Sequence, residues 1–154
     1  MKLQVDYVEY SPFTRSLDIF TIGCNGSCKG CCNPEIKDWN LKGLSLDETS
    51  LKVCDLYKQF EILIDRLFIV GGDPVDCENM TNGEVSSLID EIKKTISKPI
   101  YLFTRHDIEN IPNSLLDRVD YVKTGAYIPE LTVDNNIQYG IKLATSNQKI
   151  YKLR

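Results

Sequence analysis

The stretch RLFIVGGDP, residues 66–74, says most about the fold of this chain. Its first five residues are a short apolar run that ends at a Gly-Gly pair. A short apolar run of this kind is typical of a strand buried on both faces of a parallel sheet. Working outward from it, other short segments with strand patterns are predicted at residues 3–9, 17–22, 100–104 and 120–123.

Helices are predicted between these strands. The pattern Ser-x-x-Glu or Thr-x-x-Glu, a capping box that satisfies free backbone N–H groups at a helix start, occurs at residues 45–48 and 81–84. The first predicts a helix to about residue 60, and the second predicts a helix to about residue 97. A third, short helix is predicted over residues 113–118.

Alternating strands and helices predict an α/β protein, with one domain over residues 1–154 and a mainly parallel sheet flanked by helices. In such folds the chemistry lies at the carboxyl ends of the strands. A long irregular loop at 24–45 and the segments 71–74 and 104–106 each follow a predicted strand. We therefore expect these three segments to meet on one side of the molecule.

The composition excludes several classes of protein. Hydrophobic residues make up 42% and charged residues 26%, and the net charge is -4 with no basic cluster, which disfavours nucleic-acid binding. No apolar run reaches the roughly 18 residues of a membrane-spanning helix. The first ten residues alternate polar and apolar side chains and lack the apolar core of a signal peptide. A cytoplasmic location is expected.

Four of the six cysteines lie within residues 24–32, and the chain has one histidine. Such bunching in a cytoplasmic protein indicates metal or redox chemistry rather than disulfides. The spacing Cys24-x3-Cys28-x2-Cys31 suits a four-iron cubane cluster, because such clusters are held by cysteine thiolates at short spacings. Three protein ligands leave one iron open, and an open coordination position is typical of catalytic metal sites.

Two other metal sites remain as alternatives. One is a structural zinc site on the same three cysteines and a fourth, and the other is a cluster that only transfers electrons. Zinc needs four ligands, and Cys32 is adjacent to Cys31, so that the two rarely point at one ion. We interpret Cys32, Cys54 and Cys77 as non-ligands; Cys54 flanks the inner face of a predicted helix.

The cysteine spacing resembles that of the radical S-adenosylmethionine superfamily. Several further segments resemble a narrower family within it, the activating enzymes of the anaerobic ribonucleoside-triphosphate reductase. These segments are Gly30 with Asn33, Pro34, Glu35 and Trp39, then Gly71-Gly72-Asp73-Pro74, Thr104, and Ser146-Asn147-Gln148. The chain departs from the family elsewhere. Of the family's Asn-Gly-Pro-Gly-x-Arg segment, Pro12 and Arg15 match and both glycines are absent; Arg105 replaces a glycine; and Thr124-Gly125 replaces Asp-Gly.

The resemblance implies an incomplete TIM-type barrel and a specific chemistry. It implies that a [4Fe-4S] cluster on Cys24, Cys28 and Cys31 reductively cleaves S-adenosylmethionine. The resulting 5′-deoxyadenosyl radical would take hydrogen from a glycine of the anaerobic reductase. An electron donor such as flavodoxin is expected. Alternatives are the activation of another glycyl-radical enzyme, a radical reaction on a small molecule, and a non-catalytic iron–sulfur or zinc module.

The resemblance also indicates which residues serve the site. Beyond the cluster no catalytic residue is expected, and Asp73 is expected to attract the ammonium group of S-adenosylmethionine. Residues expected to contact that cofactor are Gly30, Cys31, Cys32, Gly71, Gly72, Asp73, Pro74 and Thr104. Arg15, Arg105 and His106 are expected at the rim of the site.

Overall fold

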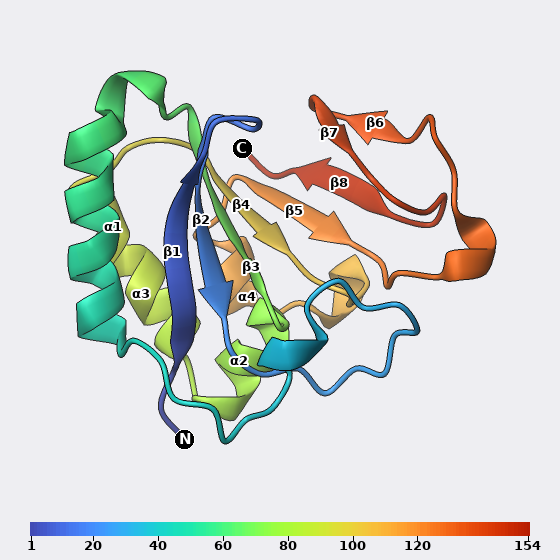
Figure 1. Cartoon of the computed structure of the whole chain (residues 1–154), viewed down its shortest axis with the longest axis horizontal. Helices are drawn as coiled ribbons and strands as arrows, with labels where there is room; N and C mark the ends of the chain where they lie inside the picture. The colour runs from blue at the N-terminus through green and yellow to red at the C-terminus, as the bar shows by residue number, and fades with distance from the viewer.

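The computed structural model describes residues 1–154 and is built on an open six-stranded sheet in the order β1-β2-β3-β4-β5-β8 (Figure 1). The strands are β1 Val5–Ser11, β2 Ser16–Thr21, β3 Arg66–Gly71, β4 Ile100–Phe103, β5 Tyr121–Thr124 and β8 Lys149–Lys152. Strands β2 to β5 are parallel, and the edge strands β1 and β8 are antiparallel to their neighbours. The mainly parallel sheet is confirmed. The incomplete TIM-type barrel that the resemblance implies is not confirmed: the sheet is open, with β1 and β8 at its two edges.

Helices cover one face of this sheet, and a small hairpin lies over part of the other (Figure 1). The α-helices are α1 Leu46–Phe60, α2 Pro74–Met80, α3 Glu84–Lys93 and α4 Asn113–Leu116. Short 3-10 helices are η1 Pro34–Ile36, η2 Glu61–Leu63, η3 Ile108–Asn110 and η4 Pro129–Leu131. The hairpin is β6 Ile137–Gln138 with β7 Ile141–Lys142. None of the helices has both the length and the apolar character needed to cross a membrane.

The starts of α1 and α3 show how well local sequence patterns predict where a helix begins. Helix α1 begins at the predicted capping box, in which Ser45 and Glu48 bond each other's backbone N–H. The second box is only half formed: the Thr81 hydroxyl accepts from the Glu84 N–H at 3.2 Å, but the N-cap of α3 is Gly83 and the helix ends at Lys93, earlier than predicted. Thr81 also follows the end of α2, a helix that was not predicted, and its hydroxyl donates to the carbonyl of Cys77.

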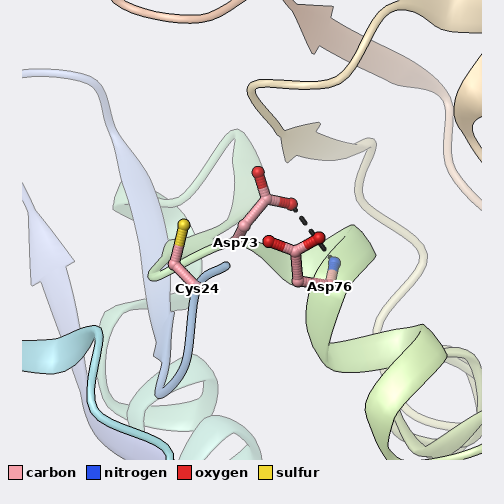
Figure 2. Close-up of side chains that lie close together, drawn as sticks. All are labelled: Cys24, Asp73 and Asp76. Atoms are coloured by element: carbon pink, nitrogen blue, oxygen red, sulfur yellow. Dashed lines mark hydrogen bonds between the residues drawn. The ribbon is translucent and has the colours of Figure 1, made fainter. Parts of the chain in front are cut away.

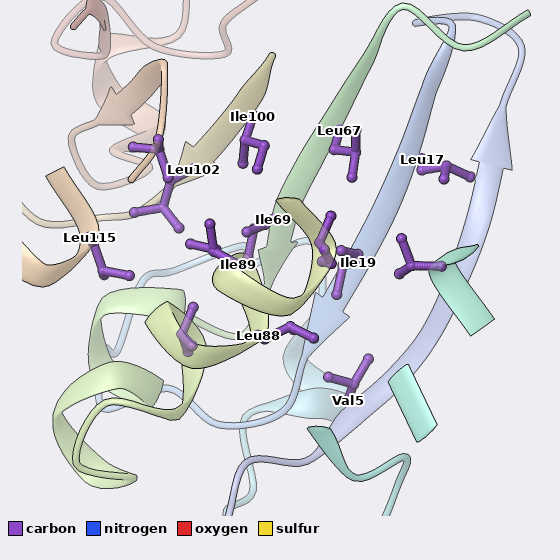
Figure 3. Packing of buried hydrophobic residues seen from close by; sticks show 14 of the residues in the cluster. Val5, Leu17, Ile19, Leu67, Ile69, Leu88, Ile89, Ile100, Leu102 and Leu115 are labelled. Atoms are coloured by element: carbon purple, nitrogen blue, oxygen red, sulfur yellow. The ribbon is translucent and has the colours of Figure 1, made fainter. Parts of the chain in front are cut away.

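The alternation of side chains along the strands gives the sheet two different faces. Leu17, Ile19, Leu67 and Ile69 point toward the helices and are wholly buried in the main core (Figure 3). Their neighbours along the same strands point the other way. On that second face the hairpin covers a smaller apolar cluster, made of Phe68, Tyr101, Ile141, Leu143 and Ile150. The rest of the second face is left as the wall of a cavity.

Candidate functional site

A cavity of about 620 Å³ lies at the carboxyl ends of the parallel strands. Its walls include the cysteine loop after β2, Gly71–Asp73 after β3, and Thr104 and Arg105 after β4. The three segments that we expected, from the sequence, to meet on one side of the molecule therefore line this one cavity. The volume is within the range of about 300–1,000 Å³ that is usual for small-molecule and cofactor sites.

Four of the six cysteines line this cavity: Cys24, Cys28, Cys31 and Cys32. The other two do not. Cys54 lies on α1, and the buried Cys77 donates its thiol to the carbonyl of Ile22 at 3.3 Å. Burial raises the pKa of the Cys77 thiol to about 12, so that it is protonated and unreactive at neutral pH.

The sulfurs of the cysteine loop do not converge on one point. The only three metal-ligating side chains whose ligand atoms all lie within 4.8 Å of one another are Cys24, Asp73 and Asp76 (Figure 2). A tetrahedral zinc ion with Zn–S bonds of about 2.3 Å requires its sulfurs to be closer together than this. In a cubane each thiolate binds a different iron, so the three thiolates of the loop need not meet at one ion.

The carboxylates of Asp73 and Asp76 are not free to bind a metal, because protein donors already occupy them. Asp73 is the N-cap of α2 and accepts from the backbone N–H of Val75 at 2.9 Å and, more weakly, from that of Asp76 at 3.4 Å (Figure 2). It also accepts from the Thr104 hydroxyl at 2.8 Å and from the Arg105 backbone N–H at 2.9 Å.

Asp73 is only 2% exposed, so these four donor groups leave its carboxylate little capacity for a further ligand. The sequence predicted that this carboxylate attracts an ammonium group of the cofactor. In the structure it joins the start of α2 to the loop after β4, which is a positioning role.

Asp76 connects the cysteine loop to the loop after β4. Its carboxylate accepts from the Asn25 backbone N–H at 2.9 Å, from Arg105 Nη2 at 2.9 Å, and lies 2.8 Å from His106 Nε2. Burial alone would raise the pKa of Asp76, but these donors outweigh it and hold the pKa below its ordinary value. Sequence reasoning missed Asp76 because it lies on the helix that was not predicted.

The Gly71-Gly72 pair brings the end of β3 into backbone contact with Thr21 and Gly23, which precede the cysteine loop. Gly72 donates its N–H to the carbonyl of Thr21, and Asp73 donates its N–H to the carbonyl of Gly23, each at 2.8 Å. A Cβ on Gly72 would lie 2.2 Å from the Gly23 carbonyl oxygen, and one on Gly71 would lie 2.3 Å from the backbone nitrogen of Thr21. The pair is therefore required for close approach of two backbones, in addition to lining the cavity.

Two features around Cys24 suit an anionic group bound to the cysteine loop. The Gly26 backbone N–H donates to Cys24 Sγ at 3.2 Å, and a hydrogen bond of this kind orients a metal ligand. Nearby, Arg105 Nε is buried without a hydrogen-bond partner, the only such side-chain atom in the protein. Burial raises the pKa of the Cys24 thiol, while Gly26 and the Arg105 guanidinium oppose that rise. A bound cluster would give Nε a sulfur acceptor, so the residues present fit one.

The remaining predicted site residues are divided between the cavity and the rest of the molecule. Gly30 lines the cavity with a φ of 70°. Pro74 is buried as the first residue of α2. His106 does not line the cavity, and its Nε2 lies 2.8 Å from the Asp76 carboxylate. Arg15 was placed wrongly at the rim: it precedes β2 at the opposite end of the strand and pairs with Asp65 at 2.7 Å.

Several cavity residues were not predicted from the sequence. Lys123 on β5 and Asp18 on β2 are polar residues on the second face of the sheet. Gln148, which the resemblance had marked only as part of a motif, is 6% exposed. Its side chain accepts from the backbone N–H groups of Ala144 and Thr145 and donates to the carbonyl of Gly125, so it fixes the C-terminal loop against the end of β5. Period-two alternation was the signal that could have placed Asp18 and Lys123 on this face.

Comparison with known families agrees with this geometry. The model of the 4Fe-4S single cluster domain matches residues 14–151. The chain belongs to this family of iron–sulfur proteins. Among curated proteins, none matches the sequence. Family membership supports a [4Fe-4S] cluster as the cofactor of this domain, and four of its six cysteines line one cavity.

Proposed function

We propose that Cys24, Cys28 and Cys31 hold the [4Fe-4S] cluster of this domain and that the domain cleaves S-adenosylmethionine. The observation that carries the proposal is that these cysteines share one cavity with the ends of β3, β4 and β5. The cavity of about 620 Å³ is larger than a cubane cluster alone would fill, which leaves room for a small-molecule cofactor beside the cluster. Cys24, Cys28 and Cys31 would hold such a cluster with one iron open, and it would supply the electron that breaks the C–S bond of the sulfonium to give methionine and a 5′-deoxyadenosyl radical.

The chain itself contributes positioning, charge and exclusion of water. Asp73 and Asp76 hold the start of α2, the cysteine loop and the loop after β4 in one arrangement through buried and partly buried hydrogen bonds. The second face of the sheet supplies an apolar wall from Phe20, Val70 and Phe103. An apolar wall excludes water from reactive intermediates. Gly30 leaves room at the cysteine loop, where a Cβ would lie 3.2 Å from the ring of Tyr127.

We further propose that the hydrogen donor is a glycine of an anaerobic ribonucleotide reductase. The support is the resemblance of Gly71–Pro74 and Ser146–Gln148 to the activating enzymes of that reductase, together with the position of Gln148 at the cavity. The electron would come from a donor of the flavodoxin class. Activation of another glycyl-radical enzyme is the alternative within the same chemistry.

The partner can be tested by mixing purified components without oxygen. Reduced, cluster-loaded protein, S-adenosylmethionine and the reductase of the same genome should give the electron paramagnetic resonance doublet of a glycyl radical. Admission of air should then cut the reductase chain at that glycine. The Cys28→Ala protein, as the matched control, should give neither result. If 5′-deoxyadenosine forms while a competent reductase shows no doublet, the partner is wrong and the cleavage chemistry remains.

A further inference from the structure

Lys123 is a partly buried cation that forms no ion pair in the structure. It lies on β5, where it pairs with Phe103 of β4, and it lines the cavity. Its ammonium group donates to the carbonyls of Thr104 at 3.3 Å and Gly125 at 3.1 Å. An ammonium has three donors, so one is left over. No carboxylate lies within 4.0 Å of it, since the ion pairs of the protein all involve other residues.

The surroundings show why this charge is unusual. Burial lowers the pKa of Lys123, and the nearby Asp73, Cys28 and Cys32 act against that lowering. Holding an ammonium away from water is costly unless an opposite charge compensates it. Arg105, the other partly buried cation at the cavity, already pairs with Asp76 at 2.9 Å. Lys123 is therefore the partly buried cation of the cavity that has no carboxylate within ion-pair distance.

We propose that Lys123 is the counter-charge of the iron–sulfur cluster and raises its reduction potential. This inference rests on the cluster ligands proposed above, but not on the cleavage of S-adenosylmethionine. A cluster held by thiolates is anionic and gains one further negative charge when it accepts an electron. A fixed positive charge in a site of low dielectric therefore stabilises the reduced cluster more than the oxidised one. Reduction by dithionite moves one electron onto the cluster and breaks no bond.

The test is a redox titration of the cluster, followed by electron paramagnetic resonance without S-adenosylmethionine. Lys123→Gln can still donate a hydrogen bond from its side-chain amide but removes the charge, and we expect its midpoint potential to shift to more negative values. Lys123→Arg should restore a potential close to that of the wild type. Lys142→Met is the matched control, because Lys142 lines the same cavity but is exposed, so its charge is screened.

An unchanged midpoint in Lys123→Gln, or an equal shift in Lys142→Met, would overturn the proposal. Iron content measured on the same wild-type samples tests the cluster itself separately.

Discussion

The carboxylate of Asp73 should matter more to folding than any other polar side chain of the site. Replacing Asp73 with alanine removes the N-cap of α2, which is worth about 0.5–2 kcal/mol in general. It also leaves the buried Thr104 hydroxyl and the Arg105 backbone N–H without their acceptor, and each unsatisfied group costs about 1–3 kcal/mol. The expected loss in the free energy of unfolding is therefore about 3 kcal/mol or more.

Urea unfolding of the apoprotein measures this loss, because the shift in midpoint at constant slope gives the change in stability. Ser45→Ala is the matched control: Ser45 caps α1 by the same kind of bond but in an exposed place, and its loss should cost about 1 kcal/mol. The reasoning is refuted if Asp73→Ala loses no more stability than Ser45→Ala. An Asp73→Ala protein that folds normally and only binds S-adenosylmethionine weakly would support the role expected from the sequence instead.

Three further outcomes are expected. Cys31→Ala should lose the four-iron cluster and Cys32→Ala should keep it, as measured by iron content after anaerobic reconstitution; equal losses would show the ligand assignment to be wrong. Burial raises the pKa of Asp18 to about 6, so the folded state binds this proton more tightly than the unfolded chain, and stability should fall as pH rises from about 4 to about 6. The loss is at most about 3 kcal/mol and smaller after solvent screening; Asp18→Asn should flatten this dependence in urea titrations across that range, and an unchanged slope would remove Asp18 as its source. Gly72→Ala should cost about 1–3 kcal/mol, because its Cβ would lie 2.2 Å from the backbone oxygen of Gly23; wild-type stability in thermal unfolding would contradict the close approach.

Short sequence patterns were enough to predict the elements whose formation depends mainly on neighbouring residues. The apolar run before Gly71 is β3, and the capping box at Ser45 starts α1. Helix α2 was missed because Asp73 and Pro74 were interpreted only as a loop, although an N-cap residue followed by proline is also a helix start. The C-terminal strands β6 and β7 are two residues long, too short to produce a periodic pattern.

The site was predictable where residue type alone carries the chemistry. The spacing of Cys24, Cys28 and Cys31 indicated a cluster, and family membership supports iron–sulfur binding. Asp76 and Lys123 could not be assigned in the same way, because their roles depend on which groups from other strands lie beside them. Arg15 was assigned to the rim of the site because it matches a family motif. In the structure Arg15 precedes β2, whereas the cysteine loop follows the other end of that strand, so the residue lies away from the site.

The most direct test of the account is reductive cleavage of S-adenosylmethionine by the isolated chain. The protein is reconstituted with iron and sulfide without oxygen, reduced with dithionite and incubated with S-adenosylmethionine, and both products are measured by chromatography. The account predicts 5′-deoxyadenosine and methionine in equal amounts from the wild type and neither from Cys28→Ala. A wild-type protein that carries its four irons, shows a reducible cluster and yields no 5′-deoxyadenosine would contradict it, leaving an iron–sulfur domain that does not carry out this chemistry.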